Sequence, residues 1–207
     1  MPFVTEGLIV GVGLILTGSA LYAYDKMSIM LIAAGAFTLY FFRDPERTVP
    51  SGEDAIVSPA DGTIDRVQNL IEPSFVGSKG KMISIVLSPF DVHVNRMPVD
   101  GTVKKIERES GSKLPAKWDK AFDHNERNHI MIQGGIPVVV TQITGIFARR
   151  IVCWVREGDR LKRGQRLGMI RFGSRTNIVL PENVKVSVRR GDRVRGGETI
   201  IARIIKS

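Results

Sequence analysis

The amino-acid sequence predicts a mainly β domain preceded by a hydrophobic helical hairpin. Two uncharged apolar runs lie near the N-terminus, and from Ile56 onward short β-like segments alternate with glycine-containing turns. Turn sequences in this second part also repeat, which indicates a β fold with internal repetition. We therefore divide the chain into a hydrophobic membrane-anchoring segment, residues 1–45, and a β domain, residues 46–207.

The apolar runs, residues 7–24 and 27–42, carry no charge, and only Asp25 and Lys26 separate them. The first run is long enough to be a candidate membrane span, and the second is slightly short for one. A tight membrane hairpin and a helix pair lying partly in one leaflet both remain open. A buried hairpin in a soluble fold is the alternative to an anchor. A cleaved signal peptide is not favoured, because no basic region precedes the first run.

A charged stretch, Arg43-Asp44-Pro45-Glu46-Arg47, ends the second run, because a proline disfavours helix in the residue before it. Most of the net charge of +9 comes from the sequence beyond this point. Basic charge beside an anchor favours anionic lipid head groups, at about 1 kcal/mol per residue near the surface. The positive-inside tendency places this domain on the cytoplasmic side of the cell membrane. Nucleic acid is not expected as a partner, because few aromatic residues interleave the arginines and no nucleic-acid module is recognisable.

Two short phrases occur twice in the β domain. Gly158-Asp159-Arg160-Leu161 with Gly164 recurs as Gly191-Asp192-Arg193-Val194 with Gly197, and Gly62-Thr63-Ile64 is echoed by Gly101-Thr102-Val103. Glycines at such turns supply positive φ angles. Repeats of this sort resemble the biotinyl/lipoyl-type barrel-sandwich, which we predict as the fold, with a strand over 167–172. A helix is predicted over 114–124; within it, Asp119-Lys120-Ala121 matches the lipoyl-attachment tripeptide by chance, because the hairpin context is missing.

The dipeptide Gly173-Ser174 follows this predicted strand and can carry out self-cleavage. In a strained turn the serine hydroxyl attacks the glycine carbonyl and converts the amide into an ester, and elimination with hydrolysis leaves a pyruvoyl group. Glycine lacks a Cβ, so the hydroxyl can approach its carbonyl closely. Taken alone, however, the dipeptide is more often an ordinary turn.

Two other residues are candidates for the same chemistry. His93 can take or relay a proton near neutral pH, and Asp61 lies in the turn Ser58-Pro59-Ala60-Asp61-Gly62. Without further context both would be structural, Asp61 binding turn amides and His93 acting as a core hydrogen-bonding group. The three histidines, His93, His124 and His129, lack metal-ligand spacing, so no metal is predicted. Cys153 is the only cysteine, which excludes intrachain disulfides.

Together these residues resemble the phosphatidylserine decarboxylase family, in particular its short archaeal-type branch. The matching segments occur in the family's order and lie between Phe41 and Pro181. They are Phe41-Phe42-Arg43-Asp44-Pro45-Glu46-Arg47, Ser58-Pro59-Ala60-Asp61-Gly62, residues 87–98 around His93, Asn125-Glu126-Arg127-Asn128, Ala148-Arg149-Arg150-Ile151 and Arg171-Phe172-Gly173-Ser174-Arg175. Several motifs in the correct order are far more specific than any one of them.

The resemblance implies a proenzyme that cuts itself between Gly173 and Ser174. The products would be a β chain, residues 1–173, and an α chain, residues 174–207, that begins with a pyruvoyl group made from Ser174. That group would form a Schiff base with the serine head group of a phospholipid and act as an electron sink as CO2 leaves. His93 matches the histidine assigned to decarboxylation, and Asp61 matches the aspartate that supports self-cleavage.

One position departs from the family pattern. Many longer relatives have a second histidine three residues after the first, whereas this chain has Arg96, which cannot act as a general base. Three possibilities stay open for cleavage: His93 oriented by Asp61, which we favour, His129 from another strand, or strain. Arg96 is a candidate for binding the substrate phosphate or carboxylate. Phe90 is a candidate for contact with the lipid chains.

The expected partners are therefore an anionic serine phospholipid, the membrane, and the two chains of the cleaved protein for each other. Phosphatidylserine and the ether-linked archaetidylserine share one head group, so the sequence does not separate them. A decarboxylase acting on another amine is a further possibility. A protein of a different functional class is the alternative to an enzyme: a non-enzymatic, membrane-anchored carrier or adaptor with a barrel-sandwich fold. The oligomeric state is left open.

Overall fold

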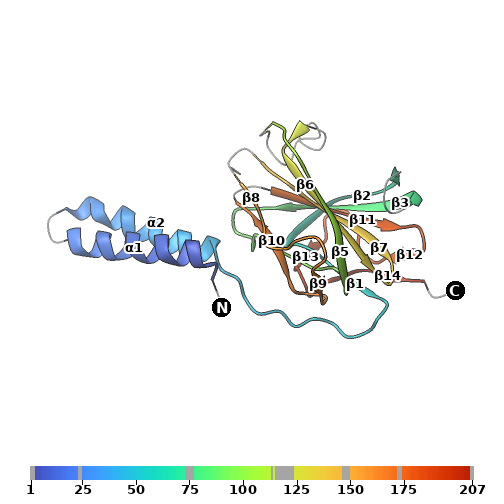
Figure 1. The fold of residues 1–207 in the computed structure, drawn as a ribbon. Helices are drawn as coiled ribbons and strands as arrows, with labels where there is room; N and C mark the ends of the chain where they lie inside the picture. The colour runs from blue at the N-terminus through green and yellow to red at the C-terminus, as the bar shows by residue number, and fades with distance from the viewer. Residues whose placement is uncertain are drawn as a thin grey trace. The chain divides into compact units, whose positions relative to one another are not determined.

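The computed structural model describes residues 3–22, 25–72, 77–112, 114, 124–145, 150–171 and 174–205, without the side chains of 70–72, 77–78 and 174. The chain divides into two compact units (Figure 1). A helical unit contains Met1–Glu46 and the short segment Phe90–Val92, and a β unit contains Arg47–Pro89 and His93–Ser207. Apart from residues 114 and 124, the helix expected over 114–124 lies outside the described residues.

The helical unit contains α1 (Thr5–Leu21), the 3₁₀ turn η1 (Lys26–Ser28) and α2 (Ile29–Phe41), and the two α-helices lie side by side (Figure 1). They approach closely at Gly11 and Gly35, where a Cβ added to Gly35 would lie 2.7 Å from the carbonyl oxygen of Gly11. The second helix ends before Pro45, as expected. Among the described residues, no helix has the length and apolar character needed to cross a membrane.

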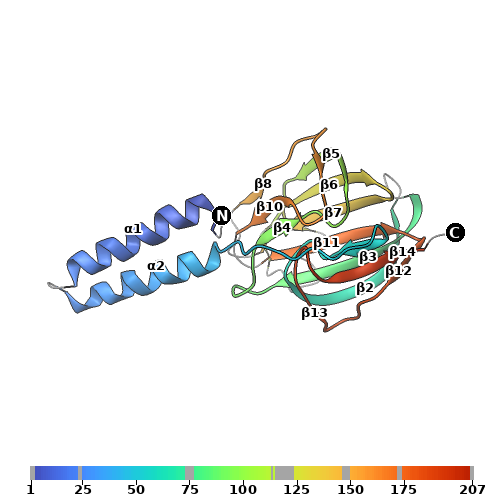
Figure 2. The same cartoon turned by 90° about the horizontal axis from the view of Figure 1, so that it is seen from below.

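The β unit confirms the predicted mainly β class, whereas its barrel-sandwich type stays a prediction. Its strands are β1 (Ala55–Val57), β2 (Gly62–Glu72), β3 (Gly77–Leu87), β4 (Val94–Arg96), β5 (Gly101–Glu109), β6 (Arg127–Gly134), β7 (Pro137–Ile143), β8 (Ile151–Cys153), β9 (Arg160–Leu161), β10 (Arg166–Ile170), β11 (Ser174–Pro181), β12 (Val184–Val186), β13 (Arg193–Val194) and β14 (Ile200–Ile204). The large sheet has the order β13-β2-β3-β11-β7-β6-β5-β9, and two three-stranded sheets have the orders β4-β10-β8 and β1-β14-β12. Figure 2 shows the long strands β2 and β3 curving together, with β11 beside β3.

Alternating residues of the large sheet build the main core on one of its faces. Neighbouring strands contribute Ile85, Ile178, Val140 and Ile130, all fully buried. Because successive side chains of a strand point to opposite faces, the residues between them face the other side. There a smaller cluster forms around Met131. Apolar alternation therefore fixes which face each polar residue of these strands occupies.

The two sequence repeats occupy equivalent places in the large sheet. Gly62 and Thr63 pair with Val194 and Arg193, whereas Gly101 and Thr102 pair with Leu161 and Arg160. The short strands β13 and β9 thus form its two edges. Each is entered through a glycine with positive φ, Gly191 at 95° and Gly158 at 92°, as expected for turn glycines.

Candidate active site

The predicted cleavage position opens the central strand β11. Ser174 is its first residue and pairs with Leu87 of β3, and the strand then pairs with β7 from Arg175 onward. Gly173 and the Ser174 side chain lie outside what the structure describes. The backbone at position 174 is nevertheless held by regular pairing that continues along the strand.

The strand before the cleavage position brings His93 close to it. β10 pairs with β4, and the Ile170 amide donates a hydrogen bond to the His93 carbonyl at 3.3 Å. Ser174 comes four positions after Ile170, so the Cα atoms of these two residues lie within about 14 Å of each other. The His93 side chain is fully buried. The backbone of His93 is therefore hydrogen-bonded to the strand that precedes the cleavage position, and contact between His93 and Ser174 stays a prediction.

Asp61 binds an arginine and a turn amide. Arg47 Nη2 lies 3.0 Å from both carboxylate oxygens, and the Gly196 amide donates to Oδ1 at 2.8 Å. Both side chains of the ion pair are largely buried, with 6% of Arg47 and 14% of Asp61 exposed. Glu198 lies 3.7 Å from the other terminal nitrogen of Arg47. The orientation of His93 by Asp61 stays a prediction.

Arg96 and Phe90, the candidate substrate contacts, have different surroundings. Arg96 is buried, and its Nη1 donates to the Gly164 carbonyl at 3.0 Å. A carbonyl acceptor and burial are features of a structural arginine, and they give no support to phosphate binding. Phe90 belongs to the helical unit, where its carbonyl accepts hydrogen bonds from Tyr40 and Arg43 and its side chain is 65% exposed.

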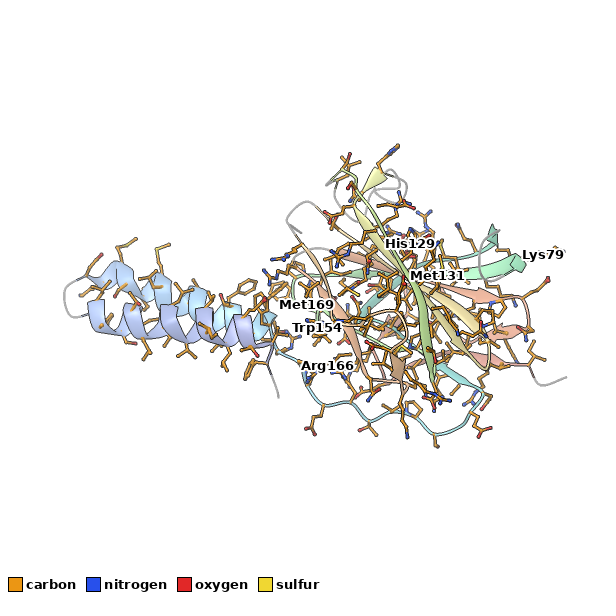
Figure 3. The ribbon with its side chains drawn as sticks, in the orientation of Figure 1. Lys79, His129, Met131, Trp154, Arg166 and Met169 are labelled. Atoms are coloured by element: carbon orange, nitrogen blue, oxygen red, sulfur yellow. The ribbon has the colours of Figure 1, made fainter. Side chains whose placement is uncertain are left out.

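His129 lies on the opposite face of the large sheet from the core. It is labelled with Met131 on β6 in Figure 3, and its Nδ1 bonds Thr141 Oγ1 at 2.9 Å. In register it aligns through Thr141 with Asn177, and therefore with the odd-numbered positions of β11. Position 174 belongs to the even-numbered set, so the register does not place it on the face of His129.

An ion pair with a fully buried arginine lies directly after the cleavage position. Arg175 is fully buried, and its Nη1 donates to Asp65 Oδ2 at 2.7 Å and to Ser84 Oγ at 2.8 Å. Burial raises the pKa of the Asp65 carboxyl, but the hydrogen bond and charge of Arg175, aided by Arg66, outweigh burial and lower that pKa below its ordinary value of 3.8. This pair holds the beginning of β11 on the face of the sheet opposite the core.

Sequence reasoning missed Arg47, the pair of Asp65 with Arg175, and a set of buried amides described below. Arg47 stands in a charged run that reads as a solvated linker, and Asp65 alternates within a strand like any exposed residue. Their partners lie far along the chain, so no local pattern marks them. An arginine immediately after the cleavage position was the one available signal.

Comparisons with known proteins identify the family of this chain. The family model described as phosphatidylserine decarboxylase matches residues 34–202. The phosphatidylserine decarboxylase proenzyme of Symbiobacterium thermophilum is 46% identical over 89% of this chain and 87% of its own, and that of Carboxydothermus hydrogenoformans is 51% identical over 81% and 80%. A relative in Methanothermobacter thermautotrophicus, named for archaetidylserine decarboxylation, is 46% identical over 88% and 87%. The chain therefore belongs to the phosphatidylserine decarboxylase family of enzymes.

Proposed function

We propose that this chain is a membrane-attached proenzyme that cleaves itself between Gly173 and Ser174 and then decarboxylates a serine phospholipid. The observation that carries the proposal is the hydrogen bond of the His93 carbonyl to Ile170, the last residue of the strand that precedes Ser174 and β11, in a chain of this family. Cleavage consumes one water and releases one ammonia, leaving a carboxylate on Gly173 and a pyruvoyl group in place of Ser174.

The arrangement of strands suits a chain that is cut at this point. The segment after the cut contains β11, which is hydrogen-bonded to β3 on one side and to β7 on the other. It also contains β14, which lies between β1 and β12. Two strands bonded to partners that precede the cut would keep the α and β chains together without a covalent link.

His93 is the residue that we propose to move protons at the site. Its buried ring and its link to Ile170 favour a role at the hydroxyl of position 174 during cleavage and at the substrate carbon afterwards. Asp61, which pairs with Arg47, would support cleavage. A pyruvoyl group supplies an electron sink for the loss of CO2 from an amine bound at its carbonyl.

The helical unit would attach the protein to the lipid surface. Both helices expose large apolar side chains, among them Ile9 (69% exposed), Leu16 (65%) and Met30 (61%). Apolar side chains grouped on exposed helices favour burial among lipid chains. We propose that the pair lies in the cytoplasmic leaflet, where the basic β unit meets anionic head groups.

The test is decarboxylation of vesicles containing phosphatidylserine, with archaetidylserine vesicles in parallel and Ser174→Ala as the inactive control. Release of CO2 with formation of the ethanolamine lipid by the wild type alone is expected. The ratio of the two rates would identify the preferred lipid. Fully cleaved wild type that releases no CO2 from either lipid would contradict the proposed substrate class while leaving self-processing intact.

A further inference from the structure

A row of buried side chains connects the strand next to His93 with the strand that begins at Ser174. Asn128 of β6 donates from Nδ2 to Gln142 Oε1 of β7 at 2.9 Å, and Gln142 donates from Nε2 to Asn95 Oδ1 of β4 at 2.9 Å. Asn95 donates from Nδ2 to Thr176 Oγ1 of β11 at 3.0 Å. All four residues of this amide network are fully buried.

The amide network joins two different sheets. Asn95 belongs to the sheet β4-β10-β8, and the other three residues belong to the large sheet. Gly168, which pairs with Asn95, allows the close approach that this requires. A Cβ at Gly168 would lie 2.2 Å from the Val152 carbonyl oxygen and 3.1 Å from Gln142 Nε2, so only glycine fits there.

The network ends beside both members of the proposed cleavage pair. Asn95 comes two residues after His93, and Thr176 comes two residues after Ser174. The side-chain Nδ2 of Asn95 also donates to the Pro59 carbonyl at 3.4 Å. Because a carbonyl can only accept, this bond identifies Nδ2 as the atom of the Asn95 side chain that faces Pro59 and Thr176. The network therefore sets how β4 lies against β11, the two strands nearest the reacting groups.

Stability alone does not account for amides at these positions. The neighbouring positions of the same core face hold isoleucine and valine, such as Ile130 and Val140. A polar group left unpaired in such a core costs about 1–3 kcal/mol, so loss of any of the three hydrogen bonds of the network is costly. Asn128 Oδ1 is already buried without a hydrogen-bond partner among the described residues. What the network contributes is one relative placement of the two sheets, at which all three hydrogen bonds form.

We propose that Gln142 and Asn95 are positioning residues that hold β4 against β11 so that His93 meets Ser174 during self-cleavage. The proposal rests on the proposed function, because it concerns the same reaction. Gln142 is the sharper residue to test, since it is the middle link and uses both its oxygen and its nitrogen.

Two substitutions separate positioning from general stability. Gln142→Met removes both hydrogen bonds with little change in shape. Gln142→Glu keeps the acceptor for Asn128, but it can donate to Asn95 only when the acid is protonated. Burial raises the pKa of such a carboxyl, so the donor returns as the pH falls. Thr141→Val is the matched control, because this neighbour on β7 loses its hydrogen bond to His129 on the other face.

The extent of cleavage is measured by intact mass, and melting is measured in the Ser174→Ala background. We expect Gln142→Met to cleave at least about tenfold more slowly, since small misplacements of reacting groups are costly. It should also melt below Thr141→Val, because it leaves Asn128 Nδ2 and Asn95 Oδ1 buried without these partners. Cleavage is therefore compared at a temperature at which both variants remain folded. Relative to the wild type at the same pH, Gln142→Glu should cleave far more slowly at about pH 8 than at about pH 6, because both proteins share the response of His93 to pH. Thr141→Val should cleave like the wild type.

Three results would overturn the positioning role. One is cleavage of Gln142→Met at the wild-type rate, and another is a rate of Gln142→Glu, relative to the wild type at the same pH, that does not depend on pH. A loss of cleavage in Thr141→Val equal to that in Gln142→Met would also overturn it, because general weakening of β7 would then suffice. A wild-type chain that stays uncut would instead contradict the proposed function.

Discussion

Asp61 and Asp100 occupy equivalent places in the two repeats of the β unit. Asp61 Oδ1 accepts the Gly196 amide at 2.8 Å, and Asp100 Oδ1 accepts the Arg163 amide at 2.6 Å. Each aspartate thereby fastens one edge turn of the large sheet. The two aspartates differ in one respect. Among the described contacts, Arg47 binds the Asp61 carboxylate and not that of Asp100. Asp100 is therefore a control within the chain for the proposed role of Asp61 in self-cleavage.

We expect Asp61→Asn to slow self-cleavage and Asp100→Asn to leave it unchanged. An asparagine can keep the turn hydrogen bond at either position, because its carbonyl oxygen still accepts. Only Asp61→Asn also removes the carboxylate that pairs with Arg47. Cleavage is followed by gel or intact mass during expression at equal protein levels. Equal effects of the two substitutions would assign Asp61 to the turn alone.

Removing Arg47 should destabilise the proenzyme more than removing an exposed arginine. Arg47→Met leaves the largely buried Asp61 carboxylate without this cation, at a cost of about 3 kcal/mol. Arg203→Met, which breaks the exposed pair with Asp54, should cost below about 1 kcal/mol. Denaturant unfolding in the Ser174→Ala background gives both free energies. Similar losses would mean that the Arg47 pair contributes no more than a surface pair.

His93→Ala is expected to slow cleavage by about a hundredfold, the lower range for loss of a general base. His129→Ala is the matched histidine control and should cleave normally, because His129 lies on the opposite face of the sheet. The rate is measured after refolding from denaturant, with far-ultraviolet circular dichroism as a check on folding. Normal cleavage by His93→Ala would leave strain or another group as the driving element.

The ion pair of Asp65 and Arg175 predicts a stability that depends on pH. Because the folded-state pKa of Asp65 lies below 3.8, the ionised carboxylate stabilises the fold above that pH. The contribution is lost as the pH falls through the lowered pKa. Asp65→Asn should therefore be less stable than the parent at neutral pH, with the difference shrinking in strong acid. The free energy of unfolding is measured against pH for Ser174→Ala, with and without Asp65→Asn. A difference between the two variants that stayed constant with pH would disprove this.

Membrane attachment should depend on the apolar surface of the helical unit. Replacing Ile9, Leu16 and Met30 with serine removes three exposed apolar side chains. Each buried apolar side chain is worth about 1.5–3 kcal/mol, so binding to anionic vesicles should fall at least tenfold. Self-cleavage should be unaffected, since it uses residues of the β unit. Unchanged co-sedimentation with vesicles would contradict attachment through these helices.

Local sequence patterns predicted the fold class and the repeats well. Glycines at 158 and 191 marked turns that the structure contains, and the echo of Gly62 with Gly101 marked equivalent strands. The longer match between Pro59-Ala60-Asp61-Gly62 and Pro98-Val99-Asp100-Gly101 was also readable, and it would have identified the turn role of Asp61.

Contacts between segments that are distant in the sequence could not be predicted from local patterns. The pairing of β10 with β4, which brings His93 toward position 174, depends on how two sheets pack, and neither strand encodes its partner. Asn95 and Gln142 look like ordinary polar residues of strands until their link across the sheets is seen. The family resemblance supplied His93 and Asp61 because motifs record such contacts indirectly.

The intact mass of the purified protein under denaturing conditions, beside Ser174→Ala, tests the central claim most directly. Two fragments split after Gly173 are expected, whose masses sum to that of the proenzyme plus one water minus one ammonia, with Ser174→Ala as a single chain. A wild-type protein that runs as one unmodified chain would contradict self-processing and the pyruvoyl group together.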